Sequence, residues 1–398
     1  MTGARTPPHV LTLVALSGLG ALSMNVFLPS LPGMARYFGV EYGLMQLSVS
    51  GYMAASAVLQ LLVGPISDRY GRRPVALGAL VIFLAATLAS LFAPTAGWFL
   101  FFRMLQATVV TCFVLSRAVV RDLYEGDRAA SMIGWVTMGM SVVPMIAPVI
   151  GGALDEAFGW RANFSMLFGL GLAVLVLVWF DMGETARGGG LSMGQQMRGY
   201  PVLMRSVRFW GYCLAAAFAS GAFFTYLGGA PFVGARVFHL SPAVVGYWFT
   251  APSIGYLIGN YISARWAMRI GMNTLILVGS IVTAAVLVAA LVADLAGMEH
   301  PLIFFGAVAF VGLGNGLVLP SANAGMLSVR PELAGTASGL GGAMNVGGGA
   351  LLASLAGALL TEGSGATPLL AIMTASGIGG IAAILWVMAR ERQIRQSG

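Results

Sequence analysis

The sequence predicts an all-α integral membrane protein with twelve transmembrane helices. Of its 398 residues, 58% are hydrophobic and only 9% are charged, and the mean hydropathy is +0.87. A water-soluble protein of this length could not bury so much apolar surface. Segments of about 20 apolar residues span a bilayer, and each must be helical because its backbone polar groups can pair only within the segment.

Twelve apolar windows of this length follow one another along the chain, separated by polar loops. The expected spans are 10–35, 43–65, 74–93, 97–118, 131–153, 161–181, 209–230, 242–264, 273–293, 301–326, 335–360 and 367–389. The longest polar break, about residues 181–208, holds three consecutive glycines and four arginines. We therefore expect an N-terminal six-helix bundle over 1–182, a cytoplasmic linker over 183–208 and a C-terminal six-helix bundle over 209–398.

The 21 basic residues are all arginine, and their distribution predicts the orientation. With both termini in the cytoplasm, 17 arginines fall on that side, three fall outside and one lies within a span. Such a bias orients membrane proteins, and the net charge of +7 suits contact with anionic lipids rather than nucleic acid. The two cysteines lie within spans and the three histidines at span ends, so we expect neither a disulfide nor a metal site.

The loop between the second and third spans, residues 64–74, reads G-P-I-S-D-R-Y-G-R-R-P and carries four charges in six positions. It resembles the Major Facilitator Superfamily signature at this place, roughly G-x-L-x-D-R-x-G-R-R. The resemblance implies an intracellular gate in which the Asp meets a helix N-terminus of the other half and the arginines pair with acids. The alternative is that the arginines only set the topology. The gate residues are Gly64, Asp68, Arg69, Gly71, Arg72 and Arg73.

A second copy of this loop lies half a chain away. The segment I-S-A-R-W at 262–266 aligns with I-S-D-R-Y at 66–70 at an offset of 196, and Arg269 aligns with Arg73. Two parallel six-span halves are the arrangement of the superfamily. Ala264 stands at the counterpart of Asp68, so we do not expect the two loops to be equivalent.

Arg103 lies inside the fourth span, about six residues or 10 Å from its outer end. A charge at such a depth is costly and points to function, although the side chain could instead extend to the outer headgroups. Arg103 and Gln106 resemble the R-x-x-Q-G motif of the superfamily, with Ala107 in place of the glycine. In drug/proton antiporters this Arg faces the central cavity and takes part in proton coupling, which the resemblance implies here.

The end of the fourth span indicates a particular group within the superfamily. Residues 116–124, S-R-A-V-V-R-D-L-Y, are similar to A-R-A-I-V-R-D-L-Y in the Bcr/CflA drug-resistance transporters, and F-L-P-S-L-P at 27–32 fits the same group. The resemblance places Arg117, Arg121 and Asp122 beside the gate. It also gives the fifth span an antiporter motif, for which ordinary helix packing is the alternative. The motif consists of Gly139, Pro144, Pro148, Gly151 and Gly152.

Asn25 departs from this group, which usually has Asp at that position in D-M-Y-L-P. Asn25 and Arg103 are expected at a similar depth, where an Asp would have been a counter-ion and a proton carrier. Asn can bond to Arg but cannot titrate. The 14 acidic residues all fall near span ends, so proton coupling would have to use Asp68, Asp122 or no acid at all.

Other polar or aromatic residues within spans are candidates to line a cavity between the halves. For each of them, packing or hydrogen bonding between helices is an equally good interpretation. They are Tyr52, Gln60, Phe224, Tyr226, Tyr256, Asn260, Asn315 and Asn345.

These observations predict a multidrug efflux transporter of the bacterial inner membrane, monomeric, with both termini cytoplasmic. The expected partners are amphipathic small-molecule drugs, protons and membrane lipids. No cofactor is expected, and the proton gradient is the expected energy source. An exporter of a metabolite such as an amino acid or sugar is the alternative. A membrane enzyme or sensor lacks support, because no acid pair, histidine cluster or nucleophile constellation lies within the spans.

Overall fold

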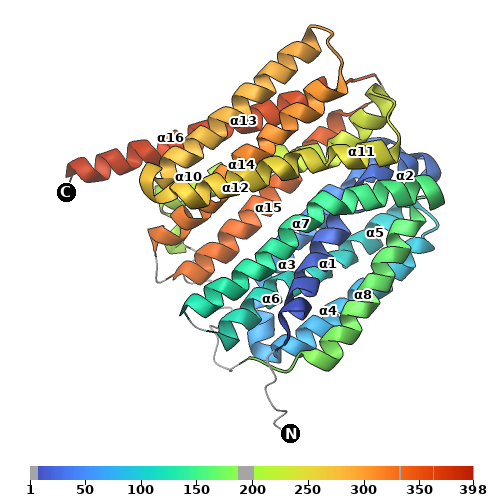
Figure 1. Cartoon of the computed structure of the whole chain (residues 1–398), viewed down its shortest axis with the longest axis horizontal. Helices are drawn as coiled ribbons and strands as arrows, with labels where there is room; N and C mark the ends of the chain where they lie inside the picture. The colour runs from blue at the N-terminus through green and yellow to red at the C-terminus, as the bar shows by residue number, and fades with distance from the viewer. Residues whose placement is uncertain (1–7, 125, 187–200, 331–332, 362, 398) are drawn as a thin grey trace.

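The computed structural model describes residues 8–124, 126–186, 201–330, 333–361 and 363–397, and these form helices joined by short loops. Within this part of the chain, ten helical segments are long and apolar enough to cross a membrane. Helix α7 and the α11–α12 pair occupy the expected fifth and eighth spans. The all-α membrane architecture predicted from the sequence is confirmed (Figure 1).

Two six-span bundles make up the molecule (Figure 1). The first contains α1 (Val10–Asn25), η1 (Leu28–Ser30), α2 (Leu31–Phe38), α3 (Tyr42–Tyr70), α4 (Arg72–Leu91), α5 (Ala96–Gln106), η2 (Ala107–Val109), α6 (Val110–Leu123), α7 (Gly126–Phe158) and α8 (Arg161–Asp181). The second contains α10 (Val207–Phe232), η3 (Val233–Val237), α11 (Pro242–Trp248), α12 (Thr250–Ile270), α13 (Met272–Leu295), α14 (Pro301–Val329), α15 (Ala334–Leu359) and α16 (Thr367–Ser397). Residues 187–200 of the expected linker lie outside the described residues.

Three of the expected spans are interrupted rather than continuous. The first span breaks after α1: η1 begins at Leu28 with Pro29 as its second residue, and a new helix, α2, begins at Leu31 with Pro32 as its second residue. Proline lacks the N–H that would continue the preceding helical ladder, which explains the break. The fourth span tightens into a 3₁₀ turn at η2, directly after Gln106, and the eighth is divided at Phe249.

The two ends of the molecule are named after the loops that lie there. The 64–74 loop, the start of α1 and the end of α16 lie at one end, which we call the gate-loop end. The loops that precede α3 and α11 lie at the opposite end, which we call the far end. The bundles pack against each other mainly through α3 with α15 and α7 with α11. Because α11 is a short helix at the far end, the α7–α11 contact belongs to that end.

Glycines bring helix backbones into direct contact in the second bundle. A Cβ added at Gly255 of α12 would overlap the carbonyl of Ala309, and one added at Gly312 of α14 would overlap the carbonyl of Pro252. In lipid, such close packing replaces the hydrophobic effect as the force that holds helices together. The α12–α14 pair therefore forms a rigid wall of the second bundle.

This packing predicts a position-dependent cost for added methyl groups. Gly312→Ala should destabilise the protein by about 1–3 kcal/mol, because the new Cβ would meet a backbone atom that cannot move away alone. Gly306→Ala on the same helix is the matched control, since nothing lies within 4 Å of its added Cβ. Thermal unfolding in detergent measures both, and equal midpoints would contradict the proposed contact.

Candidate functional site

Arg103 is enclosed by the first bundle. Its side chain is 0% exposed and turns inward from α5 rather than toward the far end. The guanidinium donates from Nε to the carbonyl of Ser48 on α3 at 3.2 Å. On α1, Nη1 donates to Ser23 Oγ at 3.1 Å and Nη2 to the Ser23 carbonyl at 2.8 Å. Two neighbouring helices thus supply neutral acceptors to one positive charge.

Two aromatic rings and an amide complete the surroundings of Arg103. Its guanidinium carbon lies 4.3 Å from the ring centroid of Phe27 and 4.2 Å from that of Tyr52. Gln106 accepts from Nη1 through Oε1 at 2.6 Å and donates through Nε2 to Thr87 Oγ1 of α4 at 3.0 Å. Ring faces and oriented dipoles replace the hydration of the charge. Among the described residues, no carboxylate bonds to it.

Asn25 lies at the end of α1 but does not take part in this arrangement. Its Nδ2 donates to the carbonyl of Ala21 at 2.7 Å, one turn earlier in its own helix. Ser23, two positions before Asn25, supplies the acceptors for Arg103. Positions two apart on a helix point about 200° away from each other. The similar depth expected for Asn25 and Arg103 therefore does not bring the two side chains together.

The remaining cavity candidates are dispersed. Tyr52 stacks on Arg103, and Tyr226 is enclosed by aromatic rings of its own bundle, the nearest that of Phe249 at 5.0 Å. Gln60 and Phe224 lie against glycines of α15, where an added Cβ at Gly342 would lie 3.3 Å from Gln60 Oε1. Four further candidates, partly or fully buried, lie on α12, α14 and α15: Tyr256, Asn260, Asn315 and Asn345.

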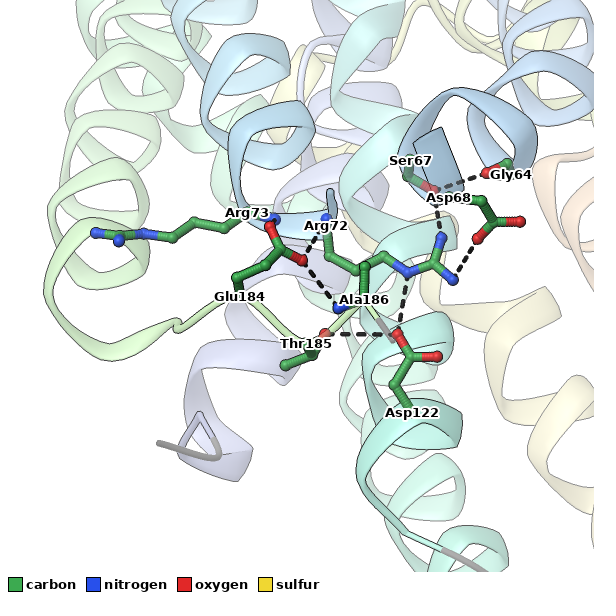
Figure 2. A network of polar contacts seen from close by, with 9 residues as sticks. All are labelled: Gly64, Ser67, Asp68, Arg72, Arg73, Asp122, Glu184, Thr185 and Ala186. Carbon is green, nitrogen blue, oxygen red and sulfur yellow. Dashed lines mark hydrogen bonds and ion pairs between the residues drawn. The ribbon is translucent and has the colours of Figure 1, made fainter. Parts of the chain in front are cut away.

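The gate loop carries a compact network of charges (Figure 2). Arg72 is its centre, with Nη2 2.5 Å from Asp68 Oδ1 and Nε 3.0 Å from Asp122 Oδ2. Ser67 Oγ accepts from Arg72 Nη1 at 2.5 Å and donates to the Gly64 carbonyl at 2.9 Å. The arginine thus joins the end of α3 to the end of α6. All of these partners belong to the first bundle.

Glu184 closes the network from the segment after α8. Its carboxylate accepts from the backbone N–H of Arg72 at 2.8 Å and of Arg73 at 3.2 Å, at the start of α4. A carboxylate is favoured there because the first N–H groups of a helix lack partners within the helix. Gly71 has a φ of +96°, and an added Cβ would overlap Glu184, so this turn requires glycine.

The other arginines of the predicted gate make different contacts. Arg73 extends away from the network and donates from Nη2 to the Trp179 carbonyl at 2.7 Å. Arg69 lies over the ring of Tyr70, and Arg117 over that of Phe113 at 4.3 Å. The side chain of Arg121 and the surroundings of Gly139 lie outside the described residues.

The fifth-span motif brings α7 against two neighbours at the far end. An added Cβ at Gly151 would overlap the carbonyl of Val26, and one at Gly152 would overlap that of Pro242 in the other bundle. Gly246 of α11 meets the carbonyl of Pro148 in the same way. Pro144 and Pro148 lie within α7, and their missing N–H groups allow it to bend.

Sequence reasoning missed several residues that the structure places at these sites. Ser23, Ser48 and Thr87 were not distinguished from the many small polar residues of the spans. Glu184 was counted only as an acid near a span end. Glu184 lies three residues after the sixth span, and the turn that receives its carboxylate, at Gly71, lies in a different loop. No pattern in a single sequence connects the two.

Comparisons with known proteins agree with this geometry. A model of the Major Facilitator Superfamily matches residues 13–240 and 230–398. The chain is 31% identical over 391 residues to multidrug resistance protein D of Escherichia coli strain K12, covering 97% of each. It is 32% identical over 364 residues to a chloramphenicol resistance protein of Pseudomonas aeruginosa, covering 87% of this chain and 84% of the relative.

A solved structure shows the same fold at low identity. It is a bacterial homolog of the human lysosomal transporter Spinster in an inward-facing and occupied conformation, with a TM-score of 0.76 and 17% identity over 96% of both chains. The family model covers nearly the whole sequence, and the relatives named for drug resistance agree with the resemblance found in the gate loop and the fourth span. This chain belongs to the Major Facilitator Superfamily.

Proposed function

We propose that this protein exports amphipathic drugs across the bacterial inner membrane by alternating access, with the gate-loop end in the cytoplasm. The observation that carries the proposal is the uneven contact between the bundles. At the far end, α7 packs on α11, and α3 packs on α15 from Gln46 at that end as far as Gln60 near the gate loop. At the gate-loop end, the described polar contacts of Asp68, Arg72 and Arg73 all stay within the first bundle.

This difference is what a transporter closed at one end requires. A pseudo-symmetric pair of bundles can rock about a central site, exposing it first to one side and then to the other. In the opposite state, the gate loop would have to exchange some internal contacts for contacts with the second bundle. Asp68 suits that exchange, because it is partly exposed and is held by Arg72 alone among the described partners.

The nature of the substrate is inferred from the relatives and from the composition of the chain. Relatives bearing the names of chloramphenicol resistance and multidrug resistance support a drug as the cargo. The flexible and apolar side chains of 22 methionines and 22 phenylalanines suit ligands of varied shape.

Proton-coupled antiport is the mechanism that the resemblance implies. Asn25 cannot carry a proton, and the acids that remain near the moving parts are Asp68 and Asp122. Both carboxylates contact Arg72, so a proton taken up by either would weaken the network that holds the gate loop. Proton coupling in this chain would have to act through this pair of carboxylates, and without it export is not driven by the proton gradient.

Drug susceptibility of a sensitive host, with and without the protein, tests the function directly. We expect the parent to confer resistance and Arg103→Ala to lose most of it, because the positive charge would be gone from the enclosed site. Arg103→Lys should not fully restore it, since an ammonium cannot replace the planar fork bonded to Ser23 and Gln106. Arg161→Lys, exposed at the far end, is the matched control. Full resistance with Arg103→Ala would leave Arg103 as a packing residue only.

The gate loop gives a second expectation. Asp68→Asn should abolish export at near-normal expression, because the neutral amide would hold a helix N-terminus of the second bundle more weakly. Labelling of introduced cysteines should shift toward the form open at the gate-loop end. Glu156→Gln, exposed at the far end, should leave both measurements unchanged. Unaltered transport by Asp68→Asn would show that the loop sets topology alone.

Asn25 tests whether drug export is coupled to proton movement. We expect the parent to bind drug with little dependence on pH, since position 25 cannot titrate. Asn25→Asp adds a titratable group within the first bundle and should make binding pH-dependent and strengthen proton-driven export. Proton release on drug addition to the purified proteins measures this, with Ser56→Asn as a control for a buried polar change. Strong release from the parent would support Asp68 and Asp122 as carriers and contradict a role for position 25.

A further inference from the structure

A polar contact crosses the two bundles at the far end. Gln46 of α3 is 1% exposed, and its Nε2 donates to the carbonyl of Ala353 on α15 at 2.6 Å. One turn earlier, the hydroxyl of Tyr42 donates to the carbonyl of Gly228 on α10. We call the contact made by Tyr42, Gln46, Gly228, Ala353 and Gly357 the outer seam.

Glycine shapes the space that receives Gln46. An added Cβ at Gly228 would overlap Gln46 Nε2, and one at Gly357 would overlap Gln46 Oε1. The amide therefore lies in a slot between α10 and α15 that exists only because both positions lack a side chain. This fit fixes the register of α3 against the second bundle when the far end is closed.

The slot leaves the amide incompletely bonded. Gln46 Oε1 is buried and has no hydrogen-bond partner among the described residues. The carbonyl of Ala353 lies inside α15, where the helical ladder already uses it, so it gains little from Gln46. A buried acceptor without a partner costs more free energy than one neutral hydrogen bond returns. Water would satisfy the whole amide once the bundles separate.

The second contact at the far end is of a different kind. Between α7 and α11, Gly152 meets the backbone of Pro242, and Gly246 meets that of Pro148. The two glycine contacts there are backbone against backbone and involve no side-chain amide. Opening that contact exposes apolar surface, whereas opening the outer seam also hydrates a polar group. The two contacts therefore resist opening to different degrees.

We propose that Gln46 is a positioning residue that aligns α3 with α10 and α15 and, through its unpaired oxygen, limits the stability of the closed far end. The inference rests on the alternating access proposed above and identifies a residue that sets its balance. Packing of Gln46 in the slot stabilises the state with a closed far end, and removal of water from its amide destabilises that state. An apolar side chain of similar length should keep the fit and remove that loss.

Two substitutions should shift the equilibrium between the open and the closed far end in opposite directions. Gln46→Met should lower the population with an open far end about tenfold, because its burial strands no acceptor. Gly357→Ala should raise that population, because its Cβ would overlap the Gln46 amide. Ser56→Ala is the matched control, since Ser56 is also buried on α3 but bonds to Tyr52 of its own helix at 2.7 Å.

Spin-label distances in the full-length protein without drug measure the populations. Cys112 and Cys213 are first replaced by alanine, which leaves the introduced cysteines as the sites for labelling. Labels at the exposed residues Phe92 and Met298 report on the far end. Labels at Tyr70 and Met268, 62% and 99% exposed, report on the gate-loop end.

The expected result is a shift of Gln46→Met toward short far-end and long gate-loop distances, with Gly357→Ala shifted the other way and Ser56→Ala unchanged. A shift of Gln46→Met in the direction of Gly357→Ala, or no larger than that of Ser56→Ala, would overturn the proposal. If Gln46→Met fails to fold, Gly357→Ala without a shift toward the open form overturns it as well. The distances need no transport assay, so a protein that exports no drug leaves this test intact.

Discussion

Direct contact between helix backbones at glycine is the interaction on which the rest of this structure depends. Lipid offers no hydrophobic gain for bringing two apolar helices together, so close packing must supply the attraction. Gly312 provides it within the second bundle, and Gly152 and Gly43 provide it between the bundles, against the backbones of Pro242 and Gly357. These contacts decide how far each helix lies from its neighbours.

Charge is accommodated in two different ways in the first bundle. Arg103 is fully enclosed and is bonded to neutral carbonyl, hydroxyl and amide groups, so its charge is solvated without being cancelled. Arg72 lies at the gate-loop end with two carboxylates, where partial exposure lowers the cost of bringing charges together. The first arrangement keeps a positive charge inside the bundle. The second can be rearranged by a proton or by a competing partner.

The spans, the gate loop and the inward position of Arg103 could be predicted, because apolar windows of bilayer length and a charge inside one of them are visible in one dimension. It is harder to predict from the sequence which face of a helix a side chain occupies and which neighbour it meets. Ser23 and Asn25 have nearly the same depth, yet only Ser23 bonds to Arg103, because two positions turn a helix by about 200°. Gln46 drew no attention, since its partners on α10 and α15 lie some 180 and 310 residues later. Such contacts depend on how the bundles meet, which no local pattern records.

The polar groups of this protein differ most in how completely they are bonded. Around Arg103, acceptors from α1, α3 and α5 converge on one guanidinium, and the chain of bonds continues through Gln106 to α4. Moving any of these helices would break at least one of these buried bonds, so the first bundle should move as a unit. At the outer seam, one amide makes one bond and leaves one oxygen unpaired. Motion is therefore expected where polar groups gain partners by separating, between the bundles, because a bistable interface needs two states of similar free energy.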